Sequence, residues 1–144
     1  MSATLSTDRR IGGRGFWLGL LGYALPTFAL GYLWHLILFA SAYRDLAIYR
    51  EDVIIPFGLL FMLVQGAAFS WLYPRIFPER RGNVLGAGLS YGLALASVSW
   101  SFTTLAVAAK SVMASVPTYL MLETGFTLVQ FAIAGPLIAW AHRN

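Results

Sequence analysis

The chain contains no cysteine and few charged residues. Without cysteine it cannot form a disulfide, a thiolate metal site, an iron–sulfur cluster or a cysteine-linked lipid anchor. Charged residues make up only 11% of its 144 residues, whereas a soluble domain usually carries about 25%. The charges that are present lie in clusters between long apolar runs, so the composition argues against an ordinary soluble fold.

Four apolar runs fill most of the chain. Runs of 18 or more apolar residues are typical of membrane-spanning helices. Here they are Phe16–Ala42, Val53–Tyr73, Val84–Ala108 and Val116–Ala141. The segments between them are too short for a separate domain, which below about 40 residues usually needs disulfides or metals. We therefore predict an all-α fold, a four-helix transmembrane bundle that forms a single integral membrane domain over residues 1–144.

The basic residues gather on one side of the predicted membrane. Cytoplasmic loops carry the excess of Lys and Arg. Both tails and the loop between the second and third runs together carry seven basic residues: Arg9, Arg10, Arg14, Arg75, Arg80, Arg81 and Arg143. The other two loops together carry three: Arg44, Arg50 and Lys110. We predict an up-down-up-down bundle with both termini cytoplasmic. The net charge of +4 is then an orientation signal and no indication of nucleic acid.

The first run has an alternative interpretation as a cleaved signal peptide. Basic residues precede it, and Ala40-Ser41-Ala42 resembles a cleavage site. The apolar part of a signal peptide is about 7–15 residues long, however, and this run is nearly twice that length. We therefore favour a retained span.

Small residues in the third run indicate close helix packing. Gly88, Gly92 and Ala96 recur at intervals of four, and small residues at that spacing let two membrane helices approach closely. Short loops also make consecutive helices antiparallel neighbours. Pro26 and Pro136 lie inside the first and fourth runs, where proline is expected to kink a helix.

Two ionisable side chains, His35 and Glu123, lie inside the predicted spans. Such residues are rare and by default mark function. In the predicted orientation both lie about 8–9 Å above the membrane midplane, at a rise of about 1.5 Å per residue. The first and fourth helices are neighbours in the predicted bundle, so these two side chains can meet.

Further polar residues extend this site along the fourth helix. Tyr119, Glu123, Thr127 and Gln130 follow helical spacing and form one polar stripe. Gln65 in the second helix lies at about the depth of Gln130. The sequence thus predicts two stacked polar layers inside the bundle.

These layers have two interpretations. The first is a structural hydrogen-bond network, since interhelical hydrogen bonds are worth about 0.6–2 kcal/mol. The second is a proton-responsive or cation-binding site at His35 and Glu123. A haem between helices needs two histidines at matched depth, and His142 lies at the opposite surface. One histidine and one carboxylate are too few for a metal. We predict no enzyme, no cofactor and no metal site.

The outer loop between the first two spans repeats the pattern Tyr-Arg-acid. It begins at Tyr43-Arg44-Asp45 and recurs at Tyr49-Arg50-Glu51. One interpretation is a lid or docking surface over the His35–Glu123 layer. The other, which we prefer, is an interfacial segment whose charges neutralise one another locally.

The stretch Tyr49–Gly58, continuing to Gln65-Gly66 and Tyr73-Pro74-Arg75, resembles a family of small, uncharacterised four-span bacterial inner-membrane proteins, grouped as a domain of unknown function. The resemblance implies a location in the bacterial inner membrane and brings no activity with it.

Our first functional hypothesis is a non-enzymatic accessory or assembly partner of a larger membrane complex, in contact with the lipid bilayer and a partner membrane protein. The alternative is a proton-responsive small transporter or channel that works as a homo-oligomer through Glu123 and His35. A pocket that reaches Glu123 would favour the alternative, and a filled core would favour the accessory role.

Overall fold

The computed structural model describes residues 11–77 and 82–143, and within these ranges every regular element is helical. Four helices are long and apolar enough to cross a membrane: Arg14–Leu38, Ile55–Ile76, Val84–Lys110 and Val116–Ala141. This confirms the predicted all-α fold with four membrane-length helices. The elements are α1 (Arg14–Leu33), η2 (Trp34–Leu38), α2 (Ala40–Leu46), α3 (Ile55–Ile76), α4 (Val84–Trp100), η3 (Ser101–Leu105), α5 (Ala106–Lys110) and α6 (Val116–Ala141).

The helix starts follow from local chemistry. Pro56 and Pro117 each lie in the first turn of their helix, where the missing N–H of proline costs no hydrogen bond. Asn83 and Ser115 cap α4 and α6, because each side chain accepts a hydrogen bond from a first-turn backbone N–H. These signals set the starts of three of the four long helices.

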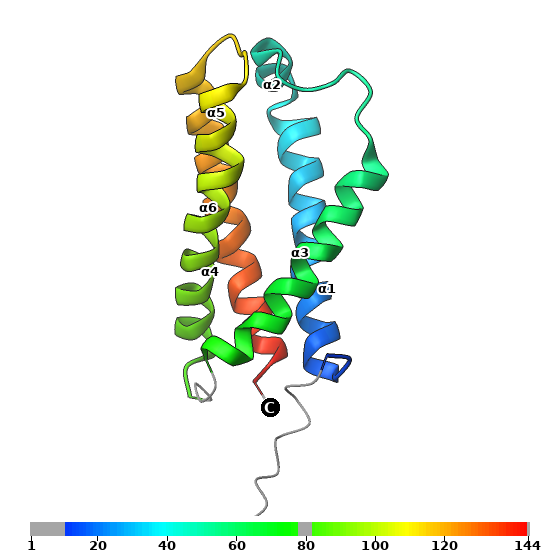
Figure 1. The fold of residues 1–144 in the computed structure, drawn as a ribbon, viewed down its shortest axis with the longest axis vertical. Helices are drawn as coiled ribbons and strands as arrows, with labels where there is room; N and C mark the ends of the chain where they lie inside the picture. Colours follow the sequence, from blue (N-terminus) through cyan, green and yellow to red (C-terminus); the bar gives the residue numbers. More distant parts are fainter. Residues whose placement is uncertain (1–10, 78–81, 144) are drawn as a thin grey trace, which may run out of the picture.

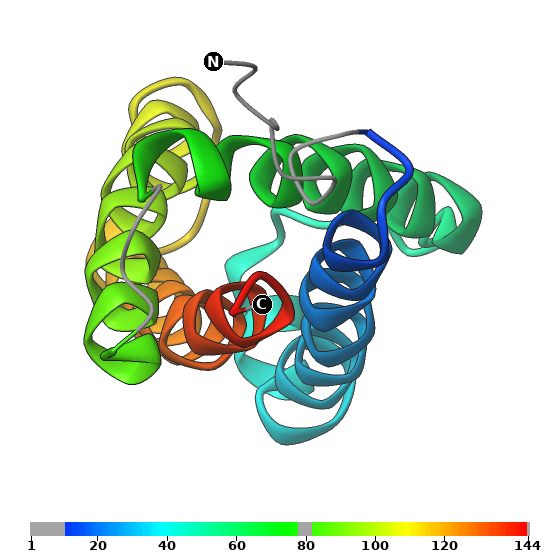
Figure 2. The same ribbon diagram turned by 90° about the horizontal axis from the view of Figure 1, so that it is seen from below.

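The long helices form an arc in which α3 packs on α1, α1 on α6, and α6 on α4 (Figure 2). The start of α1, the end of α3, the start of α4 and the end of α6 lie at one end, which we call the terminal end; α2 and α5 lie at the other, the α2 end (Figure 1). The predicted contacts of the first helix with the second and fourth are present.

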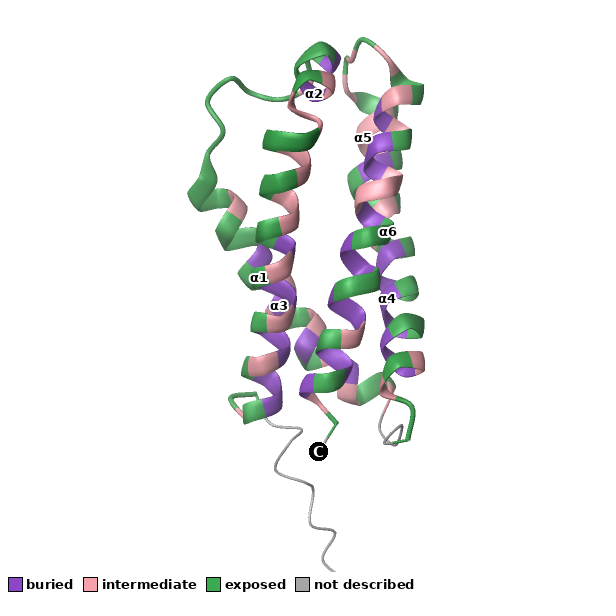
Figure 3. Cartoon of the chain, turned by 180° about the vertical axis from the view of Figure 1, so that it is seen from behind, coloured by how far each residue is buried: buried purple, intermediate pink, exposed green. Residues whose placement is uncertain are grey.

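The helix α3 is tilted across the bundle and meets α4 towards the terminal end (Figure 1). There the Tyr91 hydroxyl donates to the Phe69 carbonyl at 2.7 Å, and the rings of Tyr91 and Tyr73 pack edge to face. Towards the α2 end the two helices diverge, and α3 is largely exposed from Ile55 to Phe61 (Figure 3). The predicted neighbours α3 and α4 therefore contact each other only towards the terminal end.

The predicted close helix contact lies between α4 and α6. A Cβ atom added to Gly88 would meet the backbone nitrogen of Pro136 at 2.8 Å, and one added to Gly92 would collide with the Phe131 carbonyl. Gly135 is the matching glycine on α6, since a Cβ there would lie 2.8 Å from the Gly92 Cα. Ala96 continues the buried face of α4. Two backbones thus touch here with no side chain between them.

Two helices change their winding at the same end of the bundle. The helix α1 passes into the π-helical segment η2, and α4 passes into the π-helical segment η3. A π-turn inserts an extra residue per turn and occurs frequently at functional sites. The two segments supply His35 and Thr103 to the site described next.

Candidate functional site

Glu123 projects from α6 and is the one acidic side chain buried among the described residues, with 6% of its surface exposed. Its Oε1 atom lies 2.7 Å from the Tyr43 hydroxyl, 3.3 Å from the Tyr49 hydroxyl and 3.3 Å from His35 Nε2. All three partners come from the segment that leads from α1 to α3. The structure therefore brings His35 and Glu123 together and adds two tyrosines to the pair.

The hydrogen bonds of His35 determine which atoms carry protons. Its Nδ1 lies 3.0 Å from the Gly31 carbonyl oxygen, which can only accept, so Nδ1 carries a hydrogen. Nε2 is then a donor if the imidazole is doubly protonated and an acceptor if it is neutral. In the first case it donates to a Glu123 carboxylate, and in the second it accepts from a protonated carboxyl. The contact therefore needs one shared proton, and loss of that proton leaves two acceptors facing each other.

Tyr43 and Tyr49 enclose the pair from the α2 side. Their rings stack with centroids 5.1 Å apart, and the ring of His35 lies 4.7 Å from that of Tyr43. Burial, and after it the charge of Glu123, raises the pKa of Tyr43 above its ordinary value, and the same causes raise the pKa of Tyr49. Both hydroxyls stay protonated donors. Tyr43 is 2% exposed, so its ring belongs to the buried part of the site.

A second polar layer joins α1, α3 and α6. The Tyr23 hydroxyl donates to Gln65 Oε1 at 2.7 Å and accepts from Gln130 Nε2 at 3.0 Å. The two predicted glutamines are thus connected through a tyrosine that the sequence did not identify. Tyrosine is common on both buried and interfacial helix faces, and the one signal for Tyr23 was its position inside a predicted span.

The polar stripe predicted on α6 divides between two faces. The Tyr119 hydroxyl donates to the Thr103 carbonyl of η3 at 2.7 Å, so Tyr119 connects α6 to η3. Glu123, Thr127 and Gln130 are buried and line a cavity between the helices. Residues of one helical stripe therefore have two roles: Tyr119 contacts η3, and the other three line the cavity.

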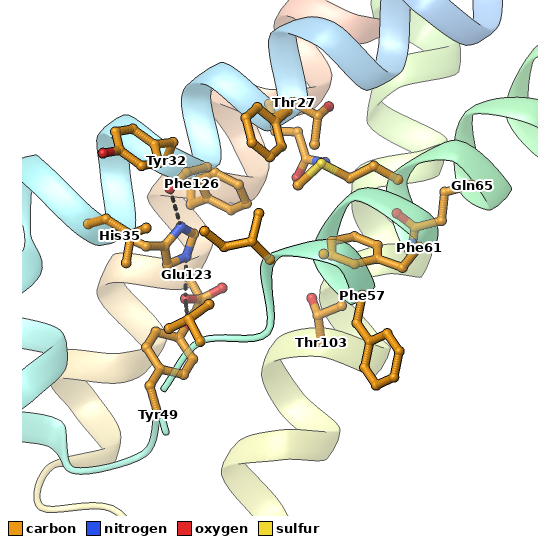
Figure 4. Close-up of a pocket in the computed structure, with 18 of the residues that line it drawn as sticks. Thr27, Tyr32, His35, Tyr49, Phe57, Phe61, Gln65, Thr103, Glu123 and Phe126 are labelled. Carbon is orange, nitrogen blue, oxygen red and sulfur yellow. Dashed lines mark hydrogen bonds and ion pairs between the residues drawn. The ribbon is translucent and has the colours of Figure 1, made fainter. Parts of the chain in front are cut away.

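A cavity of about 750 Å³ joins the two polar layers. Glu123, His35 and Tyr49 lie at one end, and Gln65 and Gln130 at the other. It opens where α3 diverges from α4, because α3 and η3 both contribute to its wall. The wall between the polar ends is mostly apolar and aromatic, as Figure 4 shows, with contributions from Phe28, Tyr32, Phe57, Phe61, Met62 and Phe126.

The loop after α2 supports both interpretations of its sequence pattern. Arg50 and Asp52 form a local ion pair with a 3.0 Å N–O distance, and the two side chains are exposed. Arg50 holds the pKa of Asp52 below its ordinary value through hydrogen bonds. Tyr49, one residue earlier, turns inward over Glu123 (Figure 4). Charge neutralisation and a cover over the site are therefore properties of the same loop.

His142 lies at the terminal end, far from His35 along the bundle. Its Nε2 is 3.0 Å from the Ser70 hydroxyl, and its ring stacks on Tyr73 at 5.6 Å. Within residues 11–77 and 82–143, no three His, Cys, Asp or Glu side chains cluster in a way that would hold a metal ion. The predicted absence of cofactors and enzymatic activity stays a prediction.

The resemblance to four-span inner-membrane proteins rests on a short stretch and also stays a prediction. The site itself rests on contacts between residues far apart in the sequence, from η2, α2, the following loop and α6. No protein-family model, curated protein or solved structure matches the chain.

Proposed function

We propose that this chain is a small proton-responsive transporter that accepts a solute into the cavity and exchanges it against a proton held by His35 and Glu123. The observation that carries this proposal is the cavity itself, which reaches the buried Glu123. Its volume of about 750 Å³ falls within the range of about 300–1,000 Å³ of small-molecule sites. A network needed only for stability requires no such space.

The His35–Glu123 contact gives the cavity two protonation states. With one shared proton the contact is a hydrogen bond, and without it two lone pairs oppose each other. Histidine is the residue type that changes charge near neutral pH. A ligand that pairs with the Glu123 oxygen therefore competes with the shared proton. This competition couples ligand binding to proton release, as an exchanger requires.

We further propose a bacterial inner-membrane location with both termini in the cytoplasm. The basic count supports this orientation. Three exposed tryptophans at the terminal end support a membrane interface at that depth, on whichever side it lies, since indole rings favour both interfaces: Trp17, Trp71 and Trp140. The guanidinium groups of Arg75 and Arg143 lie over two of these rings, at 3.9 and 4.4 Å. With this orientation the cavity lies in the outer half of the membrane.

The accessory role that we first expected is less well supported. It would fit a filled core, and the core at Glu123 contains a cavity. A transport role in a bundle of four helices required either a homo-oligomer or a cavity of its own, and the cavity removes the need for the homo-oligomer. A membrane-protein partner remains the main competing proposal.

Reconstituted vesicles test the transport proposal. The purified chain is placed in liposomes that hold a pH-sensitive dye, and cationic, anionic and neutral lipophilic solutes are added outside. We expect at least one class to move protons, and Glu123→Gln to abolish that movement. Glu51→Gln is the matched control, because Glu51 is exposed and does not line the cavity. Solute-driven proton movement that is absent for all classes, or unchanged in Glu123→Gln, would contradict the proposal.

A further inference from the structure

We infer that the cavity selects lipophilic organic cations carrying one positive charge, with Glu123 as the counter-charge and the aromatic wall as the contact surface. This inference rests on the proposed transport function and names its substrate class.

The charges around the cavity favour a cation. Apart from two tyrosines, three charged or chargeable groups line it: Glu123, His35 and Arg50. Arg50 is exposed and paired with Asp52 at 3.0 Å, so its charge is balanced locally. Once the proton shared by His35 and Glu123 is lost, Glu123 is left as the one unbalanced charge. A carboxylate in an apolar site is costly unless it is paired, and a bound cation supplies the missing partner.

The wall of the cavity favours the same class. Faces of aromatic rings attract cations, most strongly where water is excluded. The ring of Phe126 lies 4.5 Å from that of His35. Tyr49 lies across Glu123 from these two rings (Figure 4). Phe57 and Phe61 face the cavity from α3. An anion would meet both the carboxylate and the negative faces of these rings.

The route to the site suits a molecule that dissolves in lipid. The α3 side of the cavity is built from apolar side chains that are largely exposed, with Phe57 at 67% and Phe61 at 48%. In a membrane this surface faces lipid tails. A solute with an apolar exterior can therefore move sideways from the bilayer between α3 and η3.

Proton and cation then compete for one carboxylate. Glu123 is faced by His35 from η2, Tyr43 from α2 and Tyr49 from the loop; Tyr119 lies near it on α6, and Arg50 lies at the cavity mouth. Tyr43 and Tyr49 stay neutral, because burial and the nearby carboxylate raise the pKa of each. The proton shared by His35 and Glu123 is thus the one that leaves when the cation binds, and the net charge of the site is conserved.

Two probes of the same size and shape but opposite charge test the inference. Tetraphenylphosphonium and tetraphenylborate are titrated into the full chain in detergent, and binding is measured by calorimetry. We expect the cation to bind at least tenfold more tightly than the anion. Its affinity should rise by up to about tenfold per pH unit while the shared proton is bound, as required for release of one proton. Equal binding of the two probes, or tighter binding of the anion, would overturn the inference.

Variants keep the test specific to the site. Glu123→Gln retains an oxygen that can accept from Tyr43, and it should weaken cation binding at least tenfold; unchanged binding would overturn the inference. If this variant does not fold, Phe57→Leu is the substitute, with an expected loss of several-fold. Phe102→Leu is its matched control, since Phe102 is 71% exposed and lies outside the cavity wall.

The same measurements separate the inference from the proposed function. Solutes that move protons in vesicles while the phosphonium probe fails to bind would remove the cation class and leave proton exchange standing. Phosphonium binding that depends on Glu123 but releases no proton would uphold the cation site and overturn proton exchange.

Discussion

The two tyrosines on Glu123 should contribute very differently to stability. Tyr43 is 2% exposed and its hydroxyl lies 2.7 Å from the carboxylate oxygen. A hydrogen bond to a charged group is worth about 1.5–3 kcal/mol, and Tyr43→Phe removes one in a buried position. Tyr49 is 45% exposed and its hydroxyl lies at 3.3 Å. We expect Tyr49→Phe to cost less than about 1 kcal/mol, as for exposed charged contacts.

A double-mutant cycle isolates the part that depends on the charge. In the Glu123→Gln background the Tyr43 hydroxyl still meets an oxygen, but the bond is neutral and worth about 0.5–1.5 kcal/mol. The difference gives an expected Tyr43–Glu123 coupling of about 1 kcal/mol or more. Residues in one network commonly couple by about 0.5–3 kcal/mol. The Tyr49–Glu123 coupling should be less than half as large.

The free energy of unfolding can be measured by titrating purified protein in mixed micelles with denaturing detergent, with helicity read by circular dichroism. Tyr32→Phe, on the half-exposed face of α1, serves as the control for loss of a tyrosine hydroxyl. Equal coupling at Tyr43 and Tyr49 would refute the argument from distance and burial. Strict additivity at both positions would mean that Glu123 is not the acceptor of these hydroxyls.

Three further predictions follow from the packing, the tyrosines and the topology. Gly92→Leu should destabilise the bundle by about 1–3 kcal/mol in the same unfolding assay, because it forces α4 and α6 apart. The same change at Gly58, where an added Cβ has open space, should have little effect; equal losses would contradict the contact. The raised pKa of Tyr43 means that stability falls as pH rises above about 10, where unfolded tyrosine ionises, and Tyr43→Phe should flatten that alkaline loss. Single cysteines at Gly82 and Ala47, in a chain without native cysteine, should respectively resist and react with an impermeant thiol reagent in intact cells; the opposite pattern would invert the orientation.

Length and polarity were enough to predict the four helices and the pairing of His35 with Glu123. Both depend on one-dimensional quantities, namely the length of an apolar run and the depth of a residue within it. Neighbouring antiparallel helices bring equal depths together, so a residue count was sufficient. The glycines of α4 likewise indicated a close contact, although the sequence did not identify Gly135 as their partner.

The parts that the sequence missed depend on rotation and tilt. Tyr23 belongs to the glutamine layer and Tyr43 to the Glu123 layer. Each does so only because its helix turns the tyrosine towards the inside of the bundle. No periodic pattern marks them, since a tyrosine suits a buried face and an interface equally well. The cavity was also unpredictable, because it depends on the divergence of α3 from α4. Even spacing of apolar residues along α3 carries no information about that divergence.

The tilt of α3 has a consequence for the membrane around the protein. Near the terminal half, a Cβ at Gly66 would lie 3.0 Å from the Leu20 carbonyl, whereas one at Gly58 would meet nothing within 4 Å. The helix is therefore fixed at one half and unsupported at the other. Its 22 residues span about 33 Å at about 1.5 Å per residue, close to the thickness of the hydrocarbon core. A thicker bilayer would draw such a helix upright and a thinner one would increase its tilt. Acyl-chain length should therefore set the width of the cavity, and hydrophobic mismatch becomes a means of controlling access to Glu123.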